Sequence, residues 1–174
     1  MANPRQQFFL ERFEAAGGIR RNETIARQLE ENLGRLEAGG WRLVEKLAQR
    51  LSRQRAREPV RSDAALEREA ARAVAELFKG VGPKQSRNLW QDLGLTRYEI
   101  PLDSRITKWL KGMGFPIPVS ANSLGDAPYY DFALDGVQFL CAKAQVLPCV
   151  LDAAIFASYD TEWDQRTLGA LTRV

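Results

Sequence analysis

The sequence predicts an all-α fold, and three observations lead to that prediction. Apolar residues recur at helical spacing (i, i+3, i+4) through most of the chain. No segment has the period-two alternation that is typical of a half-buried strand. Glycine pairs and prolines fall between the periodic segments, where they end or begin helices. With 174 residues, 45% of them hydrophobic and 27% charged, the chain has enough apolar material for a domain core.

The N-terminal part, about residues 1–61, is expected to be helical in three segments, which are residues 5–16, 22–37 and 41–55. Gly17-Gly18 and Gly39-Gly40 separate these segments. The third segment has apolar residues at helical spacing, which predicts an inward face made of Trp41, Leu43, Val44, Leu47 and Leu51. A basic connector with a proline follows over residues 56–61.

The second part, about residues 62–174, is expected to belong to the same single domain. Ser62 or Asp63 can cap its first helix, which ends at Gly80. Another helix starts at once, with Pro83 in the first turn, where a missing N–H removes no hydrogen bond. Gly94 ends that helix. We expect Trp90 within it, and Tyr129 and Tyr130 further on, to be core or wedge residues without a catalytic role.

After residue 94 the chain is expected to be extended as far as Leu102. Asp103 then stands at the N-cap position of a short helix with the sequence SRITKWLKGMG. A proline-rich loop over residues 115–128 leads into two apolar helices, residues 129–145 and 148–158, and a short polar helix follows them.

Charge and composition exclude several classes of function. Histidine is absent, which excludes histidine acid–base chemistry, and the two cysteines, Cys141 and Cys149, are too few for a four-Cys iron–sulfur cluster or a Cys/His zinc site. Both lie in an apolar stretch and are expected to be reduced core residues. With neither a leader nor a long apolar run, the chain is expected to be a soluble cytoplasmic protein without a membrane segment.

The net charge of +3 is unevenly distributed along the chain. Basic residues gather between Lys46 and Arg61, with few acidic residues among them. Such a cluster fits a solvated helix face, and it also fits a surface that faces phosphate groups. Charge alone does not decide between the two.

The stretch GVGPKQSRNLW, residues 80–90, predicts a helix–hairpin–helix. Gly80 and Gly82 permit positive φ angles and a close approach of the backbone to a partner, while N–H groups at the start of the second helix suit an anion such as a DNA phosphate. The same pattern also fits a plain tight turn between helices. Lys84 stands in the first helical turn, where the helix dipole disfavours a cation, so it is expected to face an anion or to act as a neutral amine.

The residues GVGPK followed by IPLDSR resemble the helix–hairpin–helix DNA glycosylase superfamily, in the branch of bifunctional 8-oxoguanine glycosylase/lyases. Lys84 and Asp103 have the separation that we expect of that branch. The segment LPCVLDAAIFASYD resembles the helix that carries a base-contacting polar residue and, one turn later, a phenylalanine that stacks on the flipped base. Those positions would be Asp152 and Phe156. The resemblance covers about residues 65–160.

The resemblance implies a role for each of these residues. The backbone of Gly80, Val81 and Gly82 would bind DNA phosphate. The Asp103 carboxylate would stabilise the oxocarbenium-like sugar, and Lys84 would attack C1′ as a free amine, forming a Schiff base that leads to β-elimination. Asp103 also fits a pure N-cap role, and Lys84 also fits an exposed phosphate-binding role.

The base pocket decides the substrate. The base must be flipped into the protein, where Phe156 would stack on it and ionised Asp152 would accept the N1–H and N2–H₂ groups of a guanine-type base. We therefore expect 8-oxoguanine as the substrate, although a cationic alkylpurine would also suit a carboxylate. Phe156 as a core residue and Asp152 as an exposed helix residue are the simpler alternatives.

The chain departs from the family pattern at three places. Arg105 stands where many relatives have a histidine, Asp152 stands where the eukaryotic enzymes have glutamine, and the β-rich N-terminal domain of those enzymes is missing. The expected partner is damaged double-stranded DNA, bound by a monomer with no metal or other cofactor. A non-catalytic DNA-binding helix–hairpin–helix module is the alternative from another class, since it would need the glycines and the basic cluster without Lys84 and Asp103.

Overall fold

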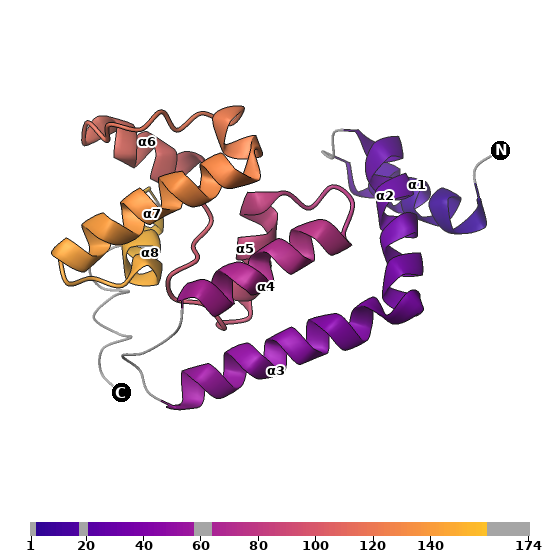
Figure 1. Cartoon of the computed structure of the whole chain (residues 1–174). Helices are drawn as coiled ribbons and strands as arrows, with labels where there is room; N and C mark the ends of the chain where they lie inside the picture. The colour runs from indigo at the N-terminus through magenta and orange to yellow at the C-terminus, as the bar shows by residue number, and fades with distance from the viewer. Residues whose placement is uncertain (1–2, 18–20, 58–63, 160–174) are drawn as a thin grey trace, which may run out of the picture.

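A computed structural model describes residues 3–17, 21–57 and 64–159 (Figure 1). Over these residues every regular element is a helix, which confirms the all-α prediction. In chain order the elements are α1 (Pro4–Ala16), α2 (Asn22–Arg35), the π-helical turn η1 (Leu36–Gly40), α3 (Trp41–Arg57), α4 (Ala64–Leu77), α5 (Pro83–Asp92), α6 (Ser104–Gly112), the 3-10 turn η2 (Ser123–Gly125), α7 (Ala127–Lys143) and α8 (Pro148–Tyr159).

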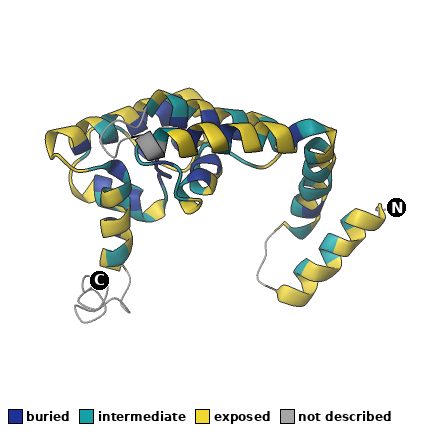
Figure 2. Ribbon diagram, turned by 90° about the horizontal axis from the view of Figure 1, so that it is seen from below, coloured by how far each residue is buried: buried dark blue, intermediate teal, exposed yellow. Residues whose placement is uncertain are grey.

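The N-terminal helices form an arm on one side of the molecule (Figure 1). No residue of α1 is buried, and Figure 2 shows that helix exposed along most of its length. The expected break between the second and third helices is a kink inside a helical turn instead of a loop. Gly39 takes a φ of 116°, which only glycine adopts without strain, and this lets the chain change direction between α2 and α3.

A first hydrophobic cluster joins α3 to α4 and α5. Its buried members are Leu47, Leu51, Ala70, Ala71, Val74 and Trp90. The expected inward face of α3 is correct for Leu47 and Leu51 but wrong for Trp41, which is 57% exposed, and for Leu43. Both residues lie in the first turn of α3, next to the kink.

A second hydrophobic cluster joins α6, α7 and α8 with the segment that precedes Asp103. Its buried members include Ile100, Leu102, Ile106, Leu110, Tyr130, Leu134, Val137 and Ile155. Helix α7 begins two residues earlier than expected, because the Asp126 side chain caps it by accepting the N–H of Tyr129. The short polar helix expected after residue 158 and most of the connector over residues 56–61 lie outside the described residues.

The C-terminal helices α7 and α8 are the most apolar part of the fold. Within the part of the chain that the structure describes, no single helix is long and apolar enough to cross a membrane; α7 and α8 meet that criterion only as a pair, and they are bent by 94°. Both cysteines are free thiols. Cys141 is buried and Cys149 is half-buried, and burial raises the pKa of each thiol.

Candidate functional site

Four residues singled out in the sequence line one cleft of about 530 Å³. They come from three helices: Lys84 from α5, Asp103 from the start of α6, and Asp152 with Phe156 from α8. The remaining lining residues are Asn88, Gln91, Asp92, Pro101, Arg105, Ala153 and Ala157. The fold therefore gathers an amine, three carboxylates and an aromatic ring around one space.

The amine of this cleft belongs to the first turn of α5. Gly82 is the N-cap of the helix and Pro83 occupies its first position, so Lys84 follows directly. Lys84, Asn88 and Gln91 share one face of the helix, and that face lines the cleft. Among the described residues no carboxylate forms an ion pair with the half-buried Lys84, so its amine is not committed to a protein partner.

Asp103 has two oxygens in different roles. Its Oδ1 accepts the N–H of Arg105 at 2.8 Å and the N–H of Ile106 at 2.9 Å, which is the expected N-cap of α6. Its Oδ2 lies 3.8 Å from Nη1 of Arg105. The cap thus fixes the carboxyl group through one oxygen, and the residue lines the cleft together with Lys84.

Asp152 lines the cleft from α8 and is joined to α5. Its carboxylate accepts a hydrogen bond from Nε2 of Gln91. Burial raises the pKa of Asp152, and the negative charges of Asp103 and Asp92 raise it further, against the opposing effects of Gln91 and Arg105. The simpler interpretation, an exposed helix residue, does not describe this half-buried and hydrogen-bonded carboxyl group.

Phe156 presents its ring to solvent at the cleft. The residue is 46% exposed, so its interpretation as a core phenylalanine is wrong. The guanidinium carbon of Arg105 lies 4.1 Å from the centre of the ring, in the geometry of a cation–π contact. Arg105 therefore connects the ring to the Asp103 carboxylate.

The two hairpin glycines differ in conformation and in surroundings. Gly80 has the expected positive φ, 76°, but a Cβ there would clash with the end of the Gln28 side chain on α2, so its side-chain direction points at the protein itself. Gly82 does not have the expected positive φ: its value is −93°, because it is an extended N-cap residue. A Cβ on Gly82 would meet only Oε1 of Gln85, at 3.3 Å.

A second cleft of about 510 Å³ opens on the hairpin side of the site. It shares Lys84 and Asp103 with the first cleft, and its lining adds Gly82, Gln85, Ser104 and Thr107 among others. Val81 is half-buried and packs against the cluster of α3, α4 and α5. Of the three hairpin residues expected to bind DNA, Gly82 is thus the one whose missing side chain leaves open space beside the amine and the carboxylate.

Side chains of α2 bind the backbone that leads into the hairpin. The Asn32 side chain makes two hydrogen bonds to the backbone of Lys79, donating to its carbonyl at 3.0 Å and accepting its N–H at 2.7 Å. Arg35 donates to the carbonyl of Leu77 at 2.8 Å. Side chains of α2 therefore satisfy backbone groups at the end of α4 that helical hydrogen bonding leaves unpaired.

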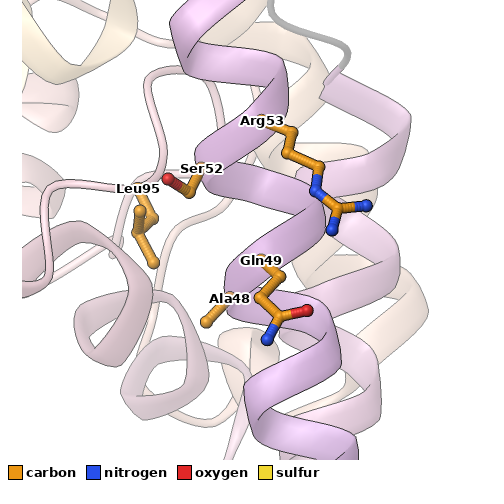
Figure 3. Close-up of a pocket in the computed structure, with 5 residues that line it drawn as sticks. All are labelled: Ala48, Gln49, Ser52, Arg53 and Leu95. Carbon is orange, nitrogen blue, oxygen red and sulfur yellow. The ribbon is translucent and has the colours of Figure 1, made fainter.

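The basic cluster of α3 is partly committed to ion pairs. Arg50 binds the Glu69 carboxylate on α4 with both terminal nitrogens, at 2.5 and 2.9 Å. A hollow of about 440 Å³ lies between α3 and Leu95 (Figure 3). Arg53 is its one charged lining residue, and Ala48, Gln49, Ser52 and Leu95 complete the lining. Without an acid–base pair, this hollow is not a candidate reaction site.

Several residues of the site were not predicted. Asn88 and Gln91 lie one and two turns after Lys84 on the same helix face, and that spacing is a signal from which they could have been found. Within the described residues no group of three or more metal-ligating side chains could hold a metal ion. Comparison of the chain with protein-family models, with curated proteins and with solved structures finds no match.

Proposed function

We propose that this protein is a helix–hairpin–helix DNA glycosylase with AP-lyase activity, which removes 8-oxoguanine from double-stranded DNA and nicks the abasic site. One observation carries the proposal: Lys84, Asp103, Asp152 and Phe156 line the same cleft although they come from three helices. The reaction requires a nucleophilic amine, a carboxylate that stabilises the developing cation, and an aromatic ring with a polar group that receive the extruded base.

In the proposed reaction the base leaves first. Phe156 stacks on the flipped base and ionised Asp152 accepts its N1–H and N2–H₂ groups. The N-glycosidic bond breaks with its electron pair passing to the base, and the Asp103 carboxylate stabilises the positive charge that develops on the sugar. The second oxygen of Asp103 does not cap α6 and lies 3.8 Å from Nη1 of Arg105, beyond hydrogen-bond distance, so it can take this role.

The amine then completes the lyase step. Lys84 Nζ forms a bond to C1′, the C1′–O4′ bond breaks, and one amine proton passes to O4′ as the sugar ring opens to a protonated Schiff base. Removal of a proton from C2′ expels the 3′-phosphate and nicks the strand. The proposal is supported by the position of Lys84, since its amine has no ion-pair partner among the described residues and borders both clefts.

A second candidate function is the excision of a cationic alkylpurine. Three carboxylates, Asp92, Asp103 and Asp152, line the cleft, and they favour a positively charged base. A panel of duplexes that each carry one lesion distinguishes the two substrates, because only one class of base should be released.

Borohydride trapping tests the proposed lyase. The wild-type protein should become covalently attached to duplex DNA that contains the lesion or an abasic site. Lys84→Gln should lose both the adduct and the nicking activity, whereas Lys79→Gln, which removes the same charge from a hairpin residue outside the cleft, should retain both. A wild type that forms no adduct with any of these duplexes would refute the lyase, and an adduct that persists in Lys84→Gln would assign the nucleophile to another amine.

A further inference from the structure

The extended segment over residues 95–102 connects α5 to α6 and ends directly before Asp103. The Glu67 carboxylate on α4 accepts three consecutive backbone N–H groups of this segment, from Arg97, Tyr98 and Glu99, at 2.7–3.1 Å. The carbonyl of Arg97 accepts the N–H of Cys149 in the first turn of α8. Helices α4 and α8 therefore both fix the first half of the segment.

The end of the segment, residues 100–102, is held by the Tyr130 side chain of α7. Its hydroxyl oxygen accepts the N–H of Leu102 at 2.5 Å, and the same hydroxyl donates to the carbonyl of Ile100 at 3.2 Å. Tyr130 is fully buried and does not line the cleft. Leu102 is the residue directly before Asp103, so this hydroxyl is the side-chain group that fixes the backbone nearest to the carboxylate.

The ring of Tyr130 is in turn held by Arg87, which is 2% exposed. The guanidinium carbon lies 4.5 Å from the ring centre. Arg87 donates to Glu99 at 2.8 Å and to Asp131 at 2.5 Å, which compensates its charge. Its third donor group, Nη1, reaches the carbonyl of Pro83 at 2.9 Å. Pro83 is the residue directly before Lys84.

The contacts of these two side chains thus end one residue before each of the two groups that the proposed reaction uses. Arg87 holds the turn that carries Lys84, Tyr130 holds the extended segment that ends before Asp103, and the ring of Tyr130 packs against the guanidinium. A hydroxyl suits this place because it donates and accepts at once and so satisfies two buried backbone groups. Phenylalanine would fill the same volume but would leave both groups unpaired.

We infer that Tyr130 is a positioning residue for Asp103, which sets the place of the carboxylate relative to Lys84 from outside the cleft. The expected effect on kinetics rests on the proposed function. The anchoring of the Leu102 N–H can be measured without any enzymatic activity. Because Tyr130 touches the segment of Asp103 and not the turn of Lys84, its hydroxyl should matter for base release more than for attack on an existing abasic site.

The test is Tyr130→Phe, with Tyr129→Phe as the matched control. Tyr129 is the adjacent residue, and its hydroxyl donates to the carbonyl of Pro118 at 2.8 Å, away from the segment. Single-turnover excision of 8-oxoguanine by Tyr130→Phe should slow by about 10- to 100-fold, as expected for a displaced catalytic group. Borohydride trapping on a pre-formed abasic site should stay within about twofold of the wild type, and Tyr129→Phe should match the wild type in both assays.

Two outcomes of the kinetic test would overturn the inference. One is unchanged excision by folded Tyr130→Phe, and the other is an equal loss of excision and trapping, since a general structural defect moves both. Amide hydrogen exchange without DNA gives a readout that is independent of the reaction. The N–H of Leu102 should exchange faster in Tyr130→Phe than in the wild type. The N–H of Val146, which lies beyond the end of α7 and donates to the carbonyl of Cys141, should exchange at an unchanged rate. A wild type that neither excises nor traps refutes the proposed function, whereas unchanged exchange at Leu102 refutes the positioning inference.

Discussion

Arg105 lies over the ring of Phe156, with its guanidinium carbon 4.1 Å from the ring centre. Its Nη1 is also 3.8 Å from Oδ2 of Asp103. In this arrangement the arginine covers a face of the ring on which the proposed base would stack. A base that stacks on this same face would displace the guanidinium, and an arginine so released is well suited to bind a DNA phosphate.

Arg105→Ala should therefore make base entry easier. A half-exposed cation–π contact contributes about 0.5–1 kcal/mol, so its loss should shift the entry equilibrium by about two- to fivefold. The fluorescence of a purine analogue at the lesion position, with the duplex saturated by protein, measures that equilibrium. Lys108→Ala is the control, because Lys108 lies over Tyr159 from the same helix and neither residue lines the cleft. Lower occupancy in Arg105→Ala would show that the arginine assists entry.

Asp103→Asn should separate the capping role from the proposed catalytic role. Asparagine caps helices about as well as aspartate, so the free energy of unfolding should change by less than about 0.5 kcal/mol. Excision should fall by about 10²- to 10³-fold, because the negative charge opposite the sugar is lost. Nicking of a pre-formed abasic site should suffer less, since no base has to leave. Thermal unfolding and single-turnover kinetics measure the two effects, and an excision rate equal to that of the wild type would leave Asp103 as a cap alone.

Asp152→Asn should weaken recognition of a guanine edge. One of the N–H groups of the base would lose its acceptor, and an unpaired buried donor costs about 1–3 kcal/mol, or about one to two decades in single-turnover excision. An alkylpurine that is bound through its charge should lose more than a neutral lesion. Equal excision of 8-oxoguanine by both proteins would place the base elsewhere.

The raised pKa of Asp152 also predicts a dependence of stability on pH. Burial disfavours the ionised form, so the folded protein binds this proton at a higher pH than the unfolded chain does. The stabilising contribution is then complete below the unfolded pKa, about 3.9, and is lost as the pH rises through the folded pKa. Asp152→Asn should therefore melt at a higher temperature than the wild type at neutral pH, and the difference should shrink towards about pH 4. A constant difference at every pH would contradict the assignment.

A side chain at Gly82 should lower the affinity for DNA, whereas a side chain at Gly80 should lower the stability of the fold. Gly82→Val keeps an allowed backbone conformation but fills space beside the proposed phosphate contact, so affinity for lesion-free duplex should fall by about ten- to hundredfold, the loss of one charge-assisted hydrogen bond. Gly80→Ala should instead destabilise the fold by about 1–2 kcal/mol, because an L-residue is strained at positive φ. Binding titrations at several salt concentrations and thermal melts measure both, and unchanged affinity in Gly82→Val would remove the hairpin from the interface.

Most of the helices could be predicted because their signals are local. The periodicity of apolar residues, the caps and the glycines act over one or two turns, and Asp103 is an example that the structure confirms as an N-cap. The sequence does not distinguish the kink at Gly39 from a break between two helices, because a glycine pair is equally compatible with a loop and with a bent helical turn.

The support of the site could not be predicted in the same way. Charged residues are expected at the surface, yet Arg87 and Glu99 are buried because they pair with each other, and Arg87 also pairs with Asp131, which is far away in the sequence. The contact of Asn32 with Lys79 likewise depends on how α2 meets the hairpin, and neither residue type signals it. Such pairings exist only after the helices have packed.

Contacts from α7 help to hold the backbone beside Lys84 and Asp103, and this has a consequence for the order in which the protein folds. Lys84 and Asp103 leave the ribosome long before Tyr130 and Asp131, which follow them by the whole of α6 and the proline-rich loop. Until α7 has emerged and packed, the guanidinium of Arg87 lacks one of its two carboxylate partners, Asp131, and the N–H of Leu102 lacks the Tyr130 hydroxyl. A nascent chain therefore carries Lys84 and Asp103 before all of the contacts that hold their backbone have formed, so assembly of the cleft is a late event in folding.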